Sequence, residues 1–132
     1  MLLMKLETKE KFSFLELAHH VALVDGDYSH REKSLINDFC IGMGIEDSHF
    51  DNDSFDLDET LNTFSSMKSK KIAVLSLMML VHIDDNFDAN EYEVICKIAQ
   101  RFNFTLKDIN LFSQWGKSVT GLYAQAIYFM ED

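Results

Sequence analysis

The stretches "VDGDYSHRE" at residues 24–32 and "IDDNFDANE" at residues 83–91 are two versions of one acidic turn. In each, Asp is followed two positions later by a second polar turn residue, then by an aromatic residue and finally by Glu. A single constant offset, without a gap, superimposes one stretch on the other in sequence. Because each turn lies between two apolar stretches, the repeat decides the fold class.

The first turn joins two expected helices. Residues 8–24 carry apolar side chains at the three-and-four spacing of a helix, with Thr8 as the expected N-cap. We expect this helix to stop at Asp25-Gly26, since Gly permits a left-handed turn. Ser29 and Glu32 then form a capping box that opens a second helix, which the left-handed cap Gly44 ends.

The second turn repeats these signals. Asp88 is the expected N-cap, Glu91 falls on Glu32, and Asn103 falls on Gly44. Asn is the next-best residue for a left-handed cap. The sequence therefore predicts an internal duplication of a helix-turn-helix unit, with one repeat over about 8–45 and the other over about 67–104.

The remaining residues also indicate helices. Asp56 caps a short helix, Ser66 or Ser69 opens the apolar helix that contains "IAVLSLMMLV", and Thr105 opens a further helix. Gly116 is expected to mark a break or kink before a last segment that runs to Met130. The sequence contains no Pro and no convincing strand. We predict one all-α domain over residues 1–132, a bundle of six or seven helices.

The amino-acid composition and net charge indicate which kinds of binding partner suit this protein. Hydrophobic residues make up 47% and charged residues 26%, which is typical of a globular domain. The net charge of −10 makes nucleic acid and anionic membranes poor partners, whereas cations and the basic face of another protein suit it. Seven acids and no Lys or Arg lie in residues 46–59, which we interpret as a mobile, solvated loop.

Three further sequence patterns predict where in the cell the protein is located. The two cysteines form no CxxC pair, which favours a reduced, cytoplasmic chain. The first residues contain no continuous apolar stretch typical of a signal peptide. The apolar run at 72–81 is too short to span a bilayer, so we expect a buried helix and no membrane insertion.

The acidic turns also carry candidate metal ligands. Asp25 and Asp84 lie where the preceding helix is expected to end, and a negative charge at the C-terminal end of a helix opposes the helix dipole. A bound cation would reverse that effect. Oxygen-only ligand sets suit Ca²⁺ or Mg²⁺ rather than Zn²⁺. Neither turn is an EF-hand loop, because both lack the expected Gly and the final bidentate Glu. The candidate ligands are Asp25, Asp27 and Glu32 in the first turn and Asp84, Asn86, Asp88 and Glu91 in the second.

Two other interpretations stay open. In the first, the acidic residues only cap helices, and the protein is a metal-independent helical scaffold or adaptor. In the second, Glu16-Leu17-Ala18-His19 and Glu46-Asp47-Ser48-His49 are the Glu-x-x-His pairs of a di-iron carboxylate enzyme. The second pair lies in the acidic loop, and no Ser or Cys nucleophile motif appears, so we expect a non-enzymatic protein.

The stretches "ALVDGDYSHREKSLINDFCIGMGI" and "LVHIDDNFDANEYEVICKIAQRFNF" resemble the two repeats of the TerB-like family. The resemblance covers about residues 12–112 and marks Asp25, Gly26 and Glu32, then Asp84 and Glu91. The chain departs from the family pattern at Asp85, where Gly is usual. The resemblance implies an all-helical domain that binds a divalent metal and acts in a bacterial stress-response assembly, such as tellurite resistance, or an envelope-associated pathway.

Overall fold

The computed structural model describes residues 2–24, 28–47, 50–84 and 87–131, and these residues form helices and no strand. The prediction of an all-α fold is confirmed, with six α-helices in the described ranges. A short 3₁₀ helix, η1, precedes them. The elements are η1 (Leu2–Lys5), α1 (Thr8–Ala22), α2 (His30–Met43), α3 (Leu57–Asn62), α4 (Met67–His82), α5 (Ala89–Arg101) and α6 (Leu106–Met130).

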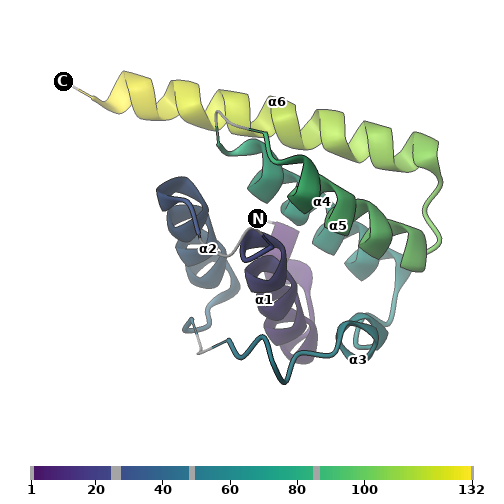
Figure 1. Cartoon of the computed structure of the whole chain (residues 1–132). Helices are drawn as coiled ribbons and strands as arrows, with labels where there is room; N and C mark the ends of the chain where they lie inside the picture. The colour runs from purple at the N-terminus through teal and green to yellow at the C-terminus, as the bar shows by residue number, and fades with distance from the viewer. Residues whose placement is uncertain (1, 25–27, 48–49, 85–86, 132) are drawn as a thin grey trace.

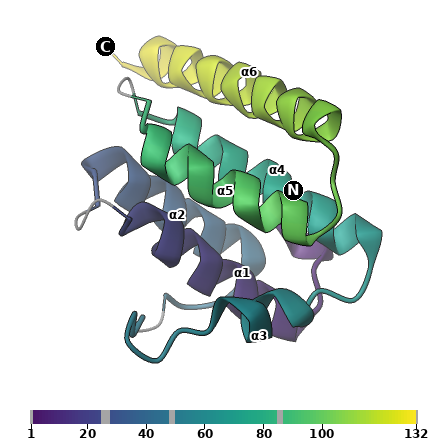
Figure 2. The same ribbon diagram turned by 45° about the vertical axis from the view of Figure 1, so that its right-hand side comes forward.

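Helix α4 lies at the centre of the bundle. It contacts α6 on one side, α5 and α1 on others, and also α2 and η1. Figures 1 and 2 show α6 lying across α4 and α5, with α1 and α2 on the opposite side and α3 beyond α1. The apolar run at 72–81 is therefore a buried helix, as predicted, because α4 must bury several faces at once. None of the helices in the described ranges is both long and apolar enough to cross a membrane.

The predicted caps of the duplicated turns are present. Ser29 accepts a hydrogen bond from the backbone of Glu32, and Asp88 accepts one from the backbone of Glu91. Gly44 and Asn103 both have left-handed backbones, with φ of 71° and 68°. A backbone hydrogen bond closes each cap. The N–H of Ile45 donates to the carbonyl of Cys40, and the N–H of Phe104 donates to the carbonyl of Ala99.

The constant offset between the two turns extends to the helix starts. Thr8 and Met67 begin α1 and α4, and His30 and Ala89 begin α2 and α5, so both helices of the second pair are displaced equally from their counterparts. Residues 8–45 and 67–104 thus carry helices at matching positions. Their superposition as two TerB-like units and their origin by duplication stay predictions.

Some local details differ from the sequence expectations. Glu7 rather than Thr8 is the N-cap of α1, and its backbone N–H donates to the Glu10 carboxylate at 3.0 Å. Helix α1 ends at Ala22, slightly earlier than expected, and Leu23 is its C-cap. The expected turn at Asp25-Gly26 lies outside the described residues. Of the two candidate serines, Ser66 is the N-cap of α4.

The prediction of a break at Gly116 is wrong. Helix α6 runs without interruption from Leu106 to Met130, and Gly116 is buried within it. A Cβ at this position would lie 2.7 Å from Cβ of Met78 and 2.8 Å from its backbone carbon. Gly116 therefore lets α6 approach α4 closely, and its missing side chain serves packing rather than a change of chain direction.

Candidate cation site

Four of the seven predicted ligands lie in the described part of the chain. Asp25, Asp27 and Asn86 lie outside the described residues. Glu32 and Glu91 each occupy the third position of their helices, α2 and α5, and both are buried, at 2% and 5% relative exposure. Acids are almost never this deeply buried without a partner, so these two positions require an explanation. The other described candidates, Asp84 and Asp88, are partly buried.

Capping engages only one of the two carboxylate oxygens of Glu32. Its Oε1 accepts a hydrogen bond from the backbone N–H of Ser29 at 3.1 Å, which completes the predicted capping box. Its Oε2 is buried, and no hydrogen-bond donor in the described ranges reaches it. A buried carboxylate oxygen without a donor destabilises the fold by about 1–3 kcal/mol or more. Capping therefore explains one oxygen of Glu32 and leaves the other unexplained.

Capping does not explain the Glu91 side chain at all. Among the described residues, the Asp88 carboxylate caps this helix and accepts from the backbone N–H groups of Asn90 at 2.8 Å and Glu91 at 3.1 Å. The pKa of Glu91 is raised to about 9, chiefly by burial, then by the adjoining carboxyl of Glu32 and by the charges of Asp88 and Asp84. The Glu91 carboxyl therefore faces another acid in a buried position.

The two repeats thus bring their glutamates together. Two like charges in contact cannot both stay ionised in a buried site without a compensating positive group. A proton shared by Glu32 and Glu91 satisfies this need, and so does a cation. Carboxylate oxygens are the ligands that Ca²⁺ and Mg²⁺ prefer, so the donor set fits these ions. Within the described ranges, no three His, Cys, Asp or Glu side chains form a cluster that could hold a metal ion.

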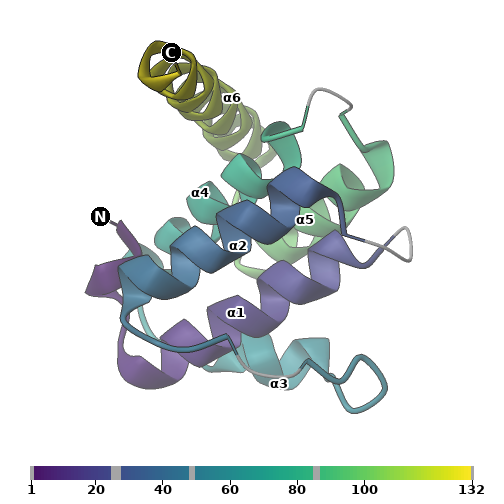
Figure 3. The same cartoon turned by 90° about the vertical axis from the view of Figure 1, so that its left-hand side faces the viewer.

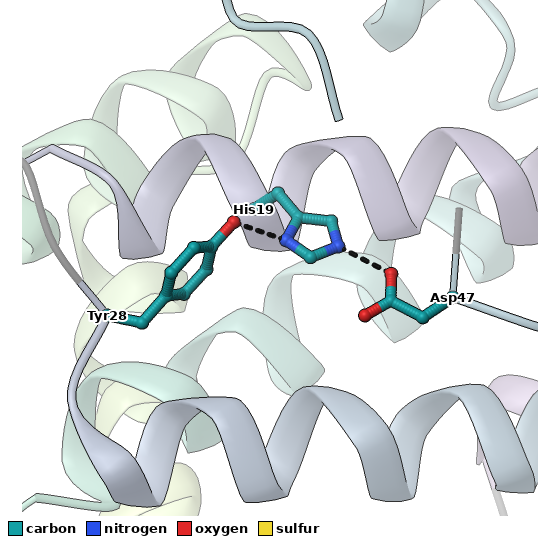
Figure 4. A network of polar contacts seen from close by, with 3 residues as sticks. All are labelled: His19, Tyr28 and Asp47. Carbon is teal, nitrogen blue, oxygen red and sulfur yellow. Dashed lines mark hydrogen bonds and ion pairs between the residues drawn. The ribbon is translucent and has the colours of Figure 1, made fainter. Parts of the chain in front are cut away.

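A second polar network adjoins the first acidic turn (Figure 4). The His19 ring in α1 lies between two partners: Nδ1 is 2.6 Å from the Tyr28 hydroxyl, and Nε2 is 2.8 Å from the Asp47 carboxylate. His19 is buried, whereas Asp47 is partly exposed. The network ties the first turn, helix α1 and the acidic segment to one another. The sequence pattern alone does not predict this role of His19.

Aromatic side chains strengthen the same attachment. Phe50 stacks on the His19 ring with centroids 5.6 Å apart, and Phe55 stacks on His20 at 4.6 Å. Both phenylalanines are partly buried, although residues 51–54 are exposed. The segment 46–59 is therefore anchored to α1 at three side chains, which a purely solvated loop would not be. Two sequence features indicate this attachment: the adjacent histidines His19 and His20 in one helix, and the phenylalanines Phe50 and Phe55 within the acidic segment.

The second acidic turn has a different neighbourhood. The Phe87 ring stacks on His82 with centroids 5.5 Å apart, and Nε2 of His82 lies 2.9 Å from the Ser113 hydroxyl in α6. These three residues, with Asp84, line a cavity of about 590 Å³. The aromatic residue of each turn thus contacts a histidine of the preceding helix. Tyr28 forms a hydrogen bond with His19, and Phe87 stacks on His82.

The Glu-x-x-His pairs do not assemble within the described ranges. Glu16 is exposed, and both ring nitrogens of His19 are engaged by Tyr28 and Asp47. Glu46 lies in the acidic segment, and His49 lies outside the described residues. The described residues therefore do not bring these pairs into one bundle core, as a di-iron carboxylate site requires.

No known family model, curated protein sequence or solved structure matches this chain.

Proposed function

We propose that this protein is a divalent-cation-binding module that uses its acidic surface to bind another protein. The contact between Glu32 and Glu91 carries the proposal. The sequence indicates both side chains as hard-oxygen ligands, and both are deeply buried acids of the acidic turns. A Ca²⁺ or Mg²⁺ ion between them would use Oε2 of Glu32, which no donor in the described ranges reaches, and would remove the repulsion between the two carboxylates.

The remaining candidate ligands would complete the shell. Asp84 and Asp88 are close enough for their charges to raise the pKa of Glu91. Asp25, Asp27 and Asn86 belong to the two loops that precede these glutamates in sequence. Because Ca²⁺ takes about six to eight oxygens and Mg²⁺ about six, contributions from both turns are needed. The ion would thereby link α2 to α5 and the first repeat to the second.

The wider role that we propose rests on the sequence. The resemblance to the TerB-like family supports a place in a stress-response assembly, such as tellurite resistance, or an envelope-associated pathway in the cytoplasm. The net charge of −10 favours a protein partner with a basic face over nucleic acid. No reaction is part of the proposal. The competing interpretation is a metal-independent scaffold, in which Glu32 and Glu91 share a proton instead of a cation.

Thermal unfolding in the presence of Ca²⁺ tests the cation site. Millimolar Ca²⁺ is expected to raise the Tm above that in EDTA, because the unfolded chain lacks the assembled ligands. The increase should disappear in Asp25→Asn, Asp84→Asn and Glu91→Gln. It should persist in Glu93→Gln, which removes an exposed acid from the same helix as Glu91. Mg²⁺ in place of Ca²⁺ tests which ion the site prefers.

Calorimetry gives the decisive negative result. If titration of the metal-free protein detects no Ca²⁺ or Mg²⁺ site tighter than about 1 mM, the weak limit for oxygen-ligand modules, the cation proposal is wrong. The scaffold interpretation would then stand. A Ca²⁺ effect on Tm that is equal in Glu91→Gln and in Glu93→Gln would also contradict the proposal, because it would reflect general screening of the acidic surface.

A further inference from the structure

The C-terminal half of α6 exposes apolar side chains on all its faces. Residues 121–131 are all exposed, whereas the earlier turns of α6 place Ile109, Gly116 and Thr120 in the core. Figures 1 and 3 show this part of α6 projecting beyond the other helices. A helix that is apolar all round is normally buried. The exposed apolar tail, as we call it, comprises Leu122, Tyr123, Ile127, Tyr128, Phe129 and Met130.

Two hollows lie beside this helix, between α6 and α2, and share Asp38 in their lining; we call them together the α2–α6 groove. At one end, Ile83, Tyr123 and Ile127, with the charged residues Arg31, Asp38 and Glu131, line a hollow of about 310 Å³. At the other end, Phe39, Met79 and Trp115 contribute to an apolar hollow of about 300 Å³. The Tyr123 hydroxyl donates to the Asp38 carboxylate at 2.9 Å, and Asp38 lines both hollows.

We propose that a second copy of this chain covers the exposed apolar tail, and that the tail of each copy lies along the α2–α6 groove of the other. The first support is charge. Residues 118–130 contain no charged side chain, although charged residues make up 26% of the chain. A partner for this segment must offer an apolar surface, and the α2–α6 groove of a second copy offers one where Phe39, Met79 and Trp115 line it.

The second support is area. Tyr128, Phe129 and Met130 are each 74–78% exposed, and Leu122 is 65% exposed. With Tyr123 and Ile127, the tail exposes roughly 800 Å² of side-chain surface, since one aromatic side chain buries about 150–250 Å². A standard stable interface buries about 800 Å² on each partner. The tail is therefore large enough to sustain a two-fold dimer in which the same surface is used by both copies.

Electrostatic repulsion predicts how dimer formation depends on salt concentration. Each copy carries a net charge of −10, so the two copies repel each other. Added salt screens that repulsion and also strengthens apolar burial. The dimer is therefore expected to tighten as NaCl is raised, whereas a complex with a basic partner would weaken.

Sedimentation equilibrium on the full chain tests the proposal. The wild-type protein is expected to be dimeric at about 100 µM and to dissociate on dilution. The double variant Tyr128→Glu/Phe129→Glu should be monomeric over the same range. The matched control Leu106→Glu/Leu111→Glu adds the same two charges at exposed leucines of α6 outside the tail and should leave the dimer intact. Far-ultraviolet circular dichroism verifies that both variants keep their helices.

Trp115 reports whether the groove is involved. It is the only Trp in the chain and lines the apolar hollow, so its emission should shift to shorter wavelength as the dimer forms. A wild-type monomer at about 100 µM, or a dimer that survives the double variant, would overturn the proposal. Binding of the monomer to phosphatidylcholine vesicles through the tail, with no dimer in their absence, would also overturn it and would assign the tail to a lipid surface.

Discussion

Glu32 and Glu91 hold the same position in their helices but have different surroundings. Glu32 caps its helix through one oxygen, whereas Glu91 takes no part in capping because Asp88 supplies both bonds. The repeated sequence pattern therefore keeps an acid at a position where the second helix has no use for it as a cap. The pair requires either a shared proton or a bound cation. A shared proton would make the stability depend on pH, and a bound cation would make it depend on metal as well.

Replacing Glu91 by Gln should stabilise the metal-free protein. The amide keeps the size of the side chain, is neutral without taking up a proton and can donate a hydrogen bond to Glu32. We expect a gain on the order of 1 kcal/mol at pH 7, measured by urea unfolding in EDTA. The same variant should lose the stabilisation by Ca²⁺. A loss of stability in EDTA would mean that the Glu91 carboxylate already has a favourable partner.

The gain should also depend on pH. The pKa of Glu91 rises from an ordinary 4.5 to about 9 in the folded state, so the folded state binds more protons than the unfolded state between these values. The stability that this proton contributes is complete below about pH 4.5 and is lost as the pH rises through 9. The difference in Tm between Glu91→Gln and wild type should therefore widen across that range of pH, whereas Glu93→Gln should show a nearly constant difference.

At the scale of the helices, the sequence predicts what depends on neighbouring residues. Ser29, Gly44 and Asn103 were identified correctly because a cap is a property of a few consecutive residues. Gly116 was misinterpreted because its role depends on Met78, which belongs to a different helix and is distant in sequence. A buried Gly in the middle of a helix has the same local pattern as a Gly that breaks one, and only packing distinguishes them.

Substitution of Gly116 by Ala should destabilise the contact between α4 and α6. The new Cβ would lie 2.7–2.9 Å from Cβ and backbone atoms of Met78, so the helices must move apart. We expect a net loss of about 1–3 kcal/mol, because overpacking exceeds the gain in helix propensity. Gly121→Ala is the matched control on the same helix. Nothing lies within 4 Å of its Cβ, and it should gain about 0.5–1 kcal/mol. Equal effects in urea unfolding would contradict the packing role of Gly116.

At the scale of the whole molecule, contacts between distant segments form the candidate site. The sequence predicted seven ligands from the repeated turn, but it did not predict that Glu32 in one repeat would meet Glu91 in the other. It also did not predict that His19 would join the first turn to Asp47. These pairings depend on how α1, α2 and α5 pack, and residue spacing along one segment contains no such information. The solvated interpretation of residues 46–59 was incomplete for the same reason, because it considered their charges without the surface beneath them.

The His19 network should act as one unit that joins the first turn to the acidic segment. A neutral imidazole has one donor nitrogen and one acceptor nitrogen. If Nε2 donates to the Asp47 carboxylate, Nδ1 is left to accept from the Tyr28 hydroxyl. Each bond therefore favours the ring tautomer that the other bond needs. Tyr28→Phe removes one bond and Asp47→Asn weakens the other, and each should destabilise the fold by about 0.5–1.5 kcal/mol.

The double variant should lose less stability than the sum of the two single variants, with a coupling of at least about 0.5 kcal/mol. Tyr123→Phe provides the control, because Tyr123 also donates its hydroxyl to a carboxylate, that of Asp38, but shares no residue with this network. Its combination with Asp47→Asn should be additive. Urea unfolding of the wild type and all these variants at one neutral pH measures both cycles. Additivity in the Tyr28 and Asp47 cycle would show that the His19 ring does not couple the two bonds, and the acidic segment would then be held to α1 chiefly by the stacking of Phe50 and Phe55.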